Sequence, residues 1–518
     1  MPPFGSPRTL WISLREEFAA FSWQSALTRM VADLIFVNLS MLAGFVLWYF
    51  VQVTVFGLSA TYVKTLFRPF VQAYWIYWSG LALLVFHSNG FYTRTRSYAG
   101  KYKMLVVVRS ITSFFVLFVF TDYLFFRGTL LNRGVAVLAW TFTVLTVAGS
   151  RFTKDMILRE YNVEPKVRQG KIQRVLVVGG GGYVGSALVP RLLGRGYRVR
   201  VLDSLLFGPE PLESCATHPD FELHIGDVRD IEAVVKAVKD CDAIIHLAAI
   251  VGDPACEENR PLAVEVNRLA TQMLIEIAKG YGVQRFLFAS TCSVYGASDF
   301  LVDEQTKSAP LSTYATTKID SEKILLDSET KGFHPVLLRL GTLFGLSGRP
   351  RFDLVVNLLT ARAVTTGEIT IFNGEQWRPF LHVADAARAF ITCLEAPAEV
   401  VSGEIFNIGD MRMNERLSGV SERIRSIIPT VNVVNIENSD KRNYRVDFTK
   451  AMNLLGFECL TSIEEGIREI HQAMNDGRIQ DYTSSRYNNL AVTREFSGQT
   501  AKERAAMRML DSLAHSDD

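Results

Sequence analysis

The first 150 residues of this chain and the residues after Arg174 are suited to different solvents, and this contrast limits its fold more than any other feature. Between Leu34 and Lys64, and again from Pro69 to Thr93, the sequence contains no Asp, Glu, Lys or Arg. A helix needs about 20 apolar residues to cross the hydrocarbon core of a bilayer. The sequence therefore predicts an α-helical transmembrane region over residues 1–150, with four helices near 31–55, 69–87, 104–126 and 133–150. The third and fourth stretches carry charges or are shorter, so buried core helices or interfacial helices are the alternative for these two.

Basic residues are unevenly distributed among the segments that flank these stretches. They are concentrated before the first stretch (Arg8, Arg15, Arg29), between the second and third (Arg94, Arg96, Lys101, Lys103) and after the fourth (Arg151, Lys154, Arg159, Lys166, Arg168). The two remaining loops carry only Lys64 with Arg68, and Arg127 with Arg133. Because basic loops stay in the cytoplasm, we expect a multi-pass protein integral to the cytoplasmic (inner) membrane. The lipid bilayer would surround its first part, and both termini and all residues after 150 would be cytoplasmic.

The sequence from Arg174 onward reads RVLVVGGGGYVG, a short apolar strand that runs into a glycine turn and then into a helical pattern. In such a turn Gly179 permits the tight bend, Gly182 lets the backbone approach a pyrophosphate, and Gly185 lets the helix pack on the strand. The phosphates then sit at the amino terminus of the helix, where backbone amides are unpaired. The pattern predicts a dinucleotide-binding site.

The next predicted strand, Arg198–Leu202, ends in Asp203. A carboxylate about 20 residues after the glycine turn can bind both ribose hydroxyls, and it repels a 2′-phosphate, so NAD is favoured over NADP. Asp227 and Val228 end a third strand-like run, where a loop that contacts adenine is expected. The net charge of +2 gives no reason to expect nucleic acid. No pair of the six cysteines has the spacing of a metal site, so no metal is predicted.

Tyr314 and Lys318 are four residues apart, so on a helix they share one face. A phenol with an unperturbed pKa near 10 is a poor base at neutral pH. An adjacent ammonium and a nicotinamide cation would both stabilise the phenolate and lower that pKa. The pair therefore predicts a tyrosine base tuned by a lysine, the alternative being a solvated helix face.

These motifs make residues 174 to about 475 resemble the extended short-chain dehydrogenase/reductases, specifically the NAD-dependent epimerase/dehydratase family that acts on nucleotide sugars. The resemblance implies an α/β fold with a Rossmann-like doubly wound parallel sheet. It also implies Tyr314 as catalytic base and acid, Lys318 as its tuner, and Thr291 as the hydroxyl that polarises the substrate oxygen. Members of the family commonly pair through sheet-edge helices, so a homodimer is expected. The residues that it assigns to NAD are Gly179, Gly182, Tyr183, Val184, Gly185, Asp203, Asp227, Val228, Leu247, Ala248, Ala249, Asn267, Ser290, Tyr314 and Lys318.

A nucleotide-diphosphate sugar is the substrate that the resemblance implies. Arg378, in the segment RPFLHVAD, matches the family's diphosphate-binding arginine. The fixed fork of a guanidinium suits phosphate oxygens. Arg442 is a second expected diphosphate ligand. Thr342, where the family often has Asn, and Asn357 complete the expected substrate contacts.

The residues after Thr291 narrow the reaction. Dehydratases of the family place Asp-Glu there, because elimination of water needs an acid and a base beyond the tyrosine. This chain has Cys292-Ser293, and decarboxylases carry Glu in place of Ser293. The favoured reaction is therefore inversion at C4 through a transient 4-keto sugar. A 4-ketoreductase, dehydrogenase or dehydratase of the same family is the first alternative, and a catalytically silent NAD-binding membrane scaffold is the second.

The first 150 residues resemble, more loosely, the four-span region of polysaccharide-biosynthesis proteins. This implies a role in cell-surface polysaccharide or glycan synthesis, with glycan-assembly enzymes as partners. The expected order along the chain is the transmembrane region (1–150), a linker (151–172), an NAD-binding Rossmann domain (173–335), a small C-terminal substrate-binding part with segments that return to the sheet (336–480), and a polar tail without evident chemistry (481–518).

Overall fold

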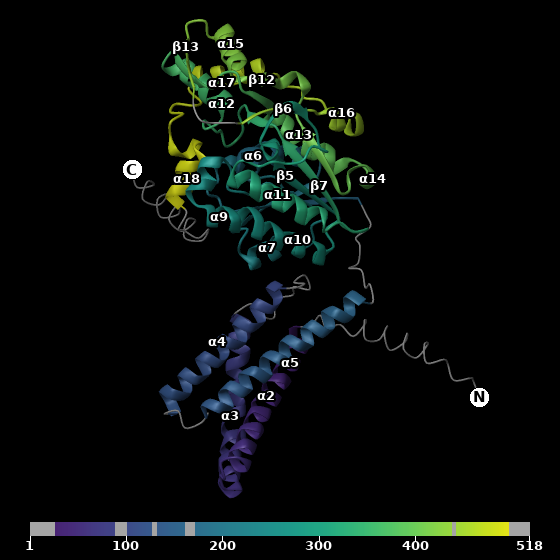
Figure 1. Ribbon diagram of the computed structural model, residues 1–518, viewed down its shortest axis with the longest axis vertical. Helices are drawn as coiled ribbons and strands as arrows, with labels where there is room; N and C mark the ends of the chain where they lie inside the picture. Colours follow the sequence, from purple (N-terminus) through teal and green to yellow (C-terminus); the bar gives the residue numbers. More distant parts are fainter. Residues whose placement is uncertain (1–25, 89–100, 127–131, 161–170, 438–441, 497–518) are drawn as a thin grey trace, which may run out of the picture. The chain divides into compact units, whose positions relative to one another are not determined.

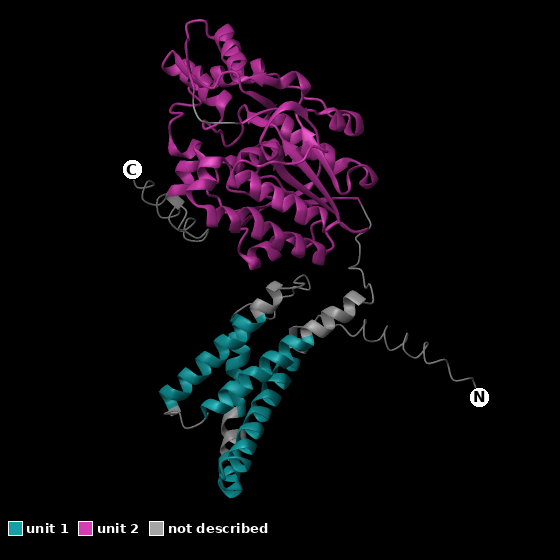
Figure 2. Cartoon of the chain, viewed as in Figure 1, with its two compact units in different colours: residues 1–164 teal, residues 165–518 magenta. Residues whose placement is uncertain are grey.

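A computed structural model describes residues 26–88, 101–126, 132–160, 171–437 and 442–496; of these, the side chains of 26–29, 68–74, 101–106, 126, 151–160 and 495–496 are left out. The chain divides into two compact units, residues 1–164 and 165–518 (Figure 2). Of the basic residues used to predict the membrane orientation, only Lys64 and Arg133 have described side chains. The end of the predicted tail, 497–518, also lies outside the described residues.

The described part of the first unit consists of long helices (Figure 1). Three of them contain a stretch long and apolar enough to cross a membrane, namely Met30–Thr54, Val107–Phe125 and Arg133–Ser150. The remaining predicted span, 69–87, falls inside a helix that includes the undescribed side chains of 68–74. Three of the four predicted spans therefore have the expected length and composition, and the fourth is helical. The helices are α2 Ala26–Thr54, α3 Ala60–Ser88, α4 Lys101–Phe126 and α5 Arg133–Glu160.

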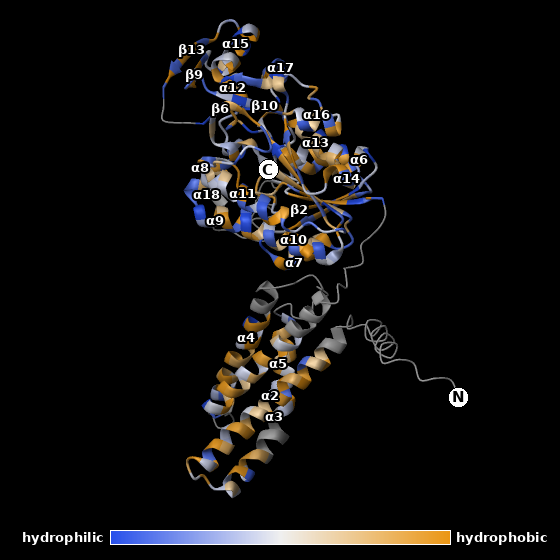
Figure 3. Cartoon of the chain, turned by 45° about the vertical axis from the view of Figure 1, so that its right-hand side comes forward, coloured by the Kyte–Doolittle hydropathy of each residue, from blue (hydrophilic) through white to orange (hydrophobic). Residues whose placement is uncertain are grey.

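Hydrophobic residues predominate along these helices (Figure 3). Large apolar side chains lie on their exposed surfaces as well as in the contacts between them. Where α2 meets α5, a Cβ on Gly44 would lie 2.8 Å from the backbone nitrogen of Ala139, so only glycine allows this approach. Small residues at helix contacts are typical of packing in lipid. The exposed large apolar residues include Ile35, Phe50, Ile76, Phe120 and Leu145.

A seven-stranded parallel sheet forms the centre of the second unit, with strand order β11-β7-β5-β4-β1-β2-β3 (Figure 1). Its strands are nearly continuous apolar runs, as expected where helices cover both faces. The order reverses direction between β1 and β4, which is the doubly wound arrangement, so the predicted fold class is confirmed. The strands are β1 Arg174–Val178, β2 Arg198–Asp203, β3 Phe221–Ile225, β4 Ala243–His246, β5 Arg285–Thr291, β7 His334–Leu340 and β11 Glu404–Ile408.

Helices pack on both faces of this sheet. Successive residues of a strand point to opposite faces, and accordingly Val177 belongs to one core and Val178 to the other. The core with Val177 includes α6 (Tyr183–Gly194) and α13 (Val383–Glu395). The core with Val178 includes α7 (Ile231–Val238), α10 (Ala270–Tyr281) and α11 (Thr313–Leu326).

The later residues build smaller sheets beside the main one. A three-stranded sheet has the order β12-β10-β8, and β11 returns to the main sheet by pairing with β7. Because β10 pairs with β8, Arg378 and Thr342 lie on neighbouring strands. The elements are β6 Ala297–Val302, β8 Thr342–Phe344, α12 Val355–Thr365, β9 Glu368–Phe372, β10 Trp377–His382, β12 Asn414–Arg416, α15 Leu417–Ile427, β13 Asn432–Ile436, β14 Asn443–Val446, α16 Thr449–Leu455 and α17 Ile463–Asn475.

Candidate active site

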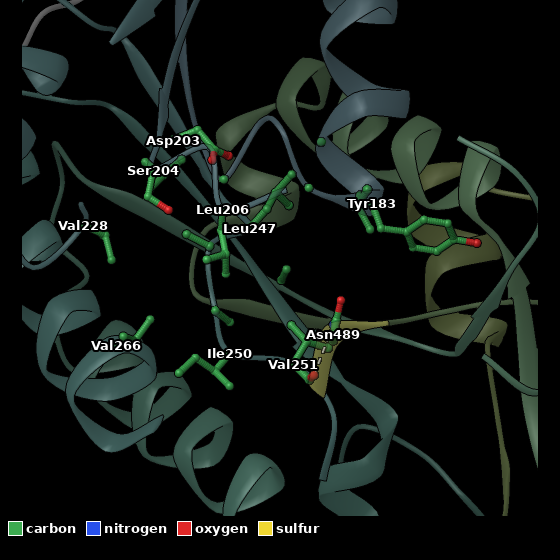
Figure 4. Close-up of a pocket in the computed structure, with 18 of the residues that line it drawn as sticks. Tyr183, Asp203, Ser204, Leu206, Val228, Leu247, Ile250, Val251, Val266 and Asn489 are labelled. Carbon is green, nitrogen blue, oxygen red and sulfur yellow. Dashed lines mark hydrogen bonds between the residues drawn. The ribbon is translucent and has the colours of Figure 1, made fainter. Parts of the chain in front are cut away.

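A cavity of about 230 Å³ lies at the carboxyl ends of the central strands of the main sheet. This edge, at the point where the strand order reverses, is where open α/β sheets bind ligands. Figure 4 shows Asp203 and Ser204 on one side of the cavity and Asn489 beside Val251 on another. Of the residues expected to bind NAD, those that line it are Gly179, Gly182, Tyr183, Val184, Gly185, Asp203, Asp227, Val228, Leu247, Ala248, Ala249, Ser290, Tyr314 and Lys318.

The glycine turn between β1 and α6 leaves no room for side chains. Gly179 has a φ of +88°, and a Cβ there would lie 2.6 Å from the backbone nitrogen of Ala248. A Cβ on Gly185 would lie 2.5 Å from the carbonyl oxygens of Gly179 and Gly180. The first turn of α6 can therefore approach the cavity with its amides uncovered, which is what a pyrophosphate requires. On this observation the turn fits a dinucleotide.

Asp203, at the end of β2, is fixed in place by the backbone. Its Oδ2 accepts a hydrogen bond from the amide of Gly181 at 2.8 Å, and its Oδ1 accepts one from Leu205 at 2.7 Å. The carboxylate therefore stands at the cavity wall in one orientation, where it can accept hydrogen bonds from ribose hydroxyls. Asp227 forms an ion pair with Arg229 at 2.7 Å. The donors and acceptors of this half of the cavity suit the adenosine part of NAD.

Asn267 was expected to bind NAD, but its side chain is buried beside the cavity and does not line it. Its Oδ1 accepts a hydrogen bond from the amide of Ile250 at 2.8 Å, and its Nδ2 donates to the carbonyl of the same residue at 3.0 Å. Through these two bonds Asn267 stabilises the 247–251 loop. Direct contact with NAD remains a prediction that the geometry does not support.

Tyr314 and Lys318 lie together on α11, whose first turn is capped by the side chain of Ser312. Lys318 Nζ donates a hydrogen bond to the carbonyl of Ala289 at 2.8 Å and lies 5.8 Å from the centre of the Tyr314 ring. Both residues line the cavity, so the solvated helix face considered as the alternative is wrong. The cap and the bonded lysine hold the phenol at a fixed place in the cavity wall.

Burial controls the protonation of this pair. It lowers the pKa of Lys318 to about 8, because the ammonium is almost fully removed from water. The surrounding protein also raises the pKa of the Tyr314 phenol, which is opposite to the direction expected from the sequence. The expected lowering depended in part on a nicotinamide cation, which belongs to the cofactor. The side chains of the protein alone keep Tyr314 protonated.

Thr291 ends β5; its neighbour Ser290 lines the cavity, but Thr291 itself is not among the lining residues. Its Oγ1 accepts a hydrogen bond from the amide of Ser293 at 3.1 Å. Cys292 points away into the core, where its Sγ contacts the carbonyl of Arg339 at 3.2 Å and burial raises the pKa of the thiol. Cys292 is buried and does not line the cavity.

The two arginines expected to bind a diphosphate lie side by side. Arg378 Nη1 donates a hydrogen bond to the carbonyl of Arg442 at 2.5 Å. Arg442 Nη1 in turn forms an ion pair with Asp253 at 2.6 Å. The structure thus brings together residues from β10 and from the stretch before β14, although their binding role remains a prediction.

The remaining expected substrate contacts differ in their surroundings. Thr342 is partly exposed on β8. Asn357 is fully buried, and its amide bonds to the backbone of Gly345 at 2.9 and 3.0 Å and of Arg351 at 2.8 Å. Asn357 therefore holds the 345–351 loop in shape, which argues against its expected contact with substrate.

Several cavity residues were not found from the sequence. Ser204, Leu206 and Phe207 directly follow Asp203, so that motif could have indicated them. Four more come from the 349–351 loop and from α18 (Asn489–Phe496), where no local pattern points to a ligand. The sequence after residue 480 shows no evident chemistry, and the structure places α18 of this stretch in the cavity wall. The cavity residues from these two segments are Arg349, Arg351, Asn489 and Thr493.

A Gly185→Ala variant is expected to lose dinucleotide binding by at least about tenfold, since the new methyl group would overlap two carbonyl oxygens of the turn. Isothermal titration with NAD measures the change. Gly194→Ala, in the last turn of the same helix, is the matched control because a Cβ there has no neighbour within 4 Å. Equal affinity in the two variants would show that the turn does not hold the dinucleotide.

Comparison with known proteins agrees with this geometry. Residues 175–409 match the family model described as "NAD dependent epimerase/dehydratase family". The chain is 31% identical over 310 residues to the uncharacterized UDP-glucose epimerase YtcB of Bacillus subtilis, covering 57% of this chain and 95% of that protein. It is 30% identical over 311 residues to UDP-glucuronic acid decarboxylase 6 of Arabidopsis thaliana, covering 57% of this chain and 86% of that protein.

A similar solved structure is that of UDP-glucuronic acid 4-epimerase from Bacillus cereus in complex with UDP-glucuronic acid and NAD. The identity is 25%, the TM-score is 0.54, and the match covers 59% of this chain and 99% of that one. A cavity built on the glycine turn, with Asp203 on one wall and the Tyr314–Lys318 pair on another, accords with these similarities. The chain belongs to the NAD-dependent epimerase/dehydratase family, and its cofactor is NAD.

Proposed function

We propose that this protein is a membrane-anchored nucleotide-sugar 4-epimerase that supplies cell-surface polysaccharide or glycan synthesis. The environment of Cys292 favours epimerisation over elimination of water. Elimination of water needs an acid and a base beyond the tyrosine, yet the position after Thr291 holds a thiol buried against the carbonyl of Arg339. Ser293 next to it has no ionisable proton near neutral pH. Chemistry at one carbinol carbon fits this environment best.

Bound NAD supplies the hydride acceptor and donor at the nicotinamide. With NAD bound, the nicotinamide cation and the Lys318 ammonium would stabilise the Tyr314 phenolate, whose proton is first lost to solvent. The phenolate then takes the proton of the sugar 4-hydroxyl and later returns it, and Thr291 donates a hydrogen bond to the same oxygen. Lys318, held by the carbonyl of Ala289, provides the positive charge beside the phenol. Arg378 and Arg442 hold the diphosphate while the sugar turns to present its other face, which inverts C4.

The proposal of a membrane anchor is supported by the three apolar helices of the first unit and by their exposed apolar side chains. With the catalytic unit on the cytoplasmic side, as the distribution of basic residues predicts, the enzyme would draw on cytoplasmic nucleotide sugars. Its product would be released beside membrane enzymes that assemble glycans, and these are the expected partners.

The reaction is tested with full-length protein in detergent, incubated with UDP-glucose or UDP-glucuronic acid and no added NAD. The names of the relatives motivate these two substrates. We expect conversion to the 4-epimer at constant mass, followed by anion-exchange chromatography and mass spectrometry. Loss of water or carbon dioxide would identify a dehydratase or decarboxylase. A need for stoichiometric dinucleotide would identify a reductase or dehydrogenase, and no conversion of either sugar would contradict the proposal.

A further inference from the structure

The segment 485–496 forms part of the cavity wall although it lies beyond the residues that match the family model. It comprises a short turn, Ser485–Tyr487, and α18. The amide of Phe352 donates a hydrogen bond to the carbonyl of Tyr487 at 3.0 Å. At the other end of the segment, Arg494 pairs with Glu258 at 2.7 Å. The segment is thus tied to both sides of the cavity.

Asn489 stands at the inner end of this segment, with its side chain beside Val251 (Figure 4). Only 7% of the residue is exposed, and its Nδ2 donates a hydrogen bond to the carbonyl of Val251 at 3.2 Å. Its Oδ1 is buried and has no partner within the described part of the chain. A buried acceptor without a donor is destabilising. A ligand in the cavity with a free N–H or O–H would remove that cost.

Arg349 reaches the same cavity from the opposite loop. Its backbone amide donates a hydrogen bond to Ser186 Oγ at 3.1 Å, which places the loop over the first turn of α6. The guanidinium lies 3.7 Å from the centre of the Phe207 ring, and its Nη2 donates to the carbonyl of Arg486 at 3.3 Å. Arg349 therefore joins the glycine-turn helix, the loop after Asp203 and the 485–496 segment.

The Arg349 guanidinium shares the charge of the nearby Asp353 carboxylate with Arg351. Only 4% of the residue is exposed, and its Nε has no hydrogen-bond partner among the described residues. The adjacent Arg351 is paired with Asp353 at 2.8 Å. Burial, and then the neighbouring charge of Arg351, lower the pKa of Arg349 to about 9. A buried cation whose charge is only partly compensated is costly, and an anion beside the α6 terminus would reduce that cost.

We infer that Arg349 and the 485–496 segment form a clasp over the bound dinucleotide, with Arg349 binding the pyrophosphate and Asn489 Oδ1 accepting a hydrogen bond from a donor of the cofactor. The clasp slows release of NAD. This use of the clasp rests on the proposed epimerase, because an epimerase returns its dinucleotide to the starting oxidation state and has no need to exchange it.

The experiment measures how fast NAD leaves. Full-length protein in detergent is loaded with radiolabelled NAD and chased with excess unlabelled NAD. We expect slow release from the natural protein and at least about tenfold faster release from Arg349→Gln and from Asn489→Leu. The matched controls are Arg478→Gln and Asn475→Leu, which make the same changes at exposed residues near the end of α17 and should stay within about twofold of the natural protein.

Thermal melting without NAD shows whether each variant folds. If Arg349→Gln does not fold, Arg349→Lys replaces it, since lysine keeps the charge but loses the fork, and an intermediate rate is expected. Release from folded variants as slow as from the natural protein, or rapid release from the natural protein itself, would overturn the clasp. Faster release from the variants in a protein that converts no nucleotide sugar would leave the clasp standing and reject the epimerase.

Discussion

A Tyr314→Phe variant is expected to lose about 10³-fold in kcat, because removal of a positioned acid–base group typically costs 10²–10⁴-fold. The ring stays in the cavity wall beside Lys318, so the affinities for NAD and for the nucleotide sugar should change by no more than about threefold. The lost atom is the phenolic oxygen that exchanges the proton of the 4-hydroxyl. The measurement is kcat for 4-epimerisation, combined with NAD binding by titration.

Tyr281→Phe is the matched control, since Tyr281 ends α10, packs against the core that contains Val178 and does not line the cavity. It should keep kcat within about twofold. If Tyr314→Phe reduced kcat by less than about tenfold, the proton would have to travel through another group and the assignment of Tyr314 as acid and base would be wrong.

The parts of the site that could be predicted are those set by spacing along a few residues. The glycine turn, Asp203 and the Tyr314–Lys318 pair each follow from the geometry of one strand end or one helix face. All of them line the cavity. Local spacing determines local placement, so such motifs need no knowledge of the rest of the fold.

Residues whose role depends on distant partners could not be found in this way. Asn489 reaches the cavity through a hydrogen bond to Val251, 238 residues earlier in the chain. Arg442 pairs with Asp253 across 189 residues. Asn357 has a polar side chain that suits a ligand, but the fold uses all of its hydrogen-bonding groups for a buried loop. Only the three-dimensional structure distinguishes an amide that faces a cavity from one that supports it.

The fold class could be predicted from the sequence, but the order of the strands in the sheet could not. The apolar run Val175–Val178 before the glycine turn indicates a buried parallel strand, and the structure places it inside the sheet, between β4 and β2. The strand order and the return of β11 to the edge beside β7 depend on packing between segments far apart in sequence. The sequence before residue 150 similarly predicts its helices from length and hydropathy, because every backbone group in lipid must be paired within its own helix.

A buried ion pair holds α11, the helix that carries Tyr314 and Lys318, against the main sheet. No pattern in the sequence indicated this pair. Arg339 on β7 and Glu322 on α11 form two hydrogen bonds, Nη2 to Oε2 at 2.7 Å and Nε to Oε1 at 3.0 Å. Both side chains are at most 5% exposed. Ser290 also donates to Glu322, and Arg339 Nη1 donates to the hydroxyl of Tyr295 at 3.0 Å. The pair therefore connects α11 to β7 and, through Ser290, to β5, which also carries Thr291.

An Arg339→Met variant is expected to lower the free energy of unfolding by about 3–5 kcal/mol, because it leaves the Glu322 carboxylate buried without its cation. The double variant Arg339→Met/Glu322→Leu should regain most of this loss, since neither charge then remains in the core. Pulse proteolysis of the full-length protein over a urea series gives the midpoint for the 165–518 unit. The control, Arg195→Met, breaks the exposed pair with Glu395, where the side chains are 58% and 38% exposed, and should cost no more than about 1 kcal/mol. A double variant as unstable as Arg339→Met alone would show that the loss comes from packing of the arginine stem and not from the uncompensated carboxylate.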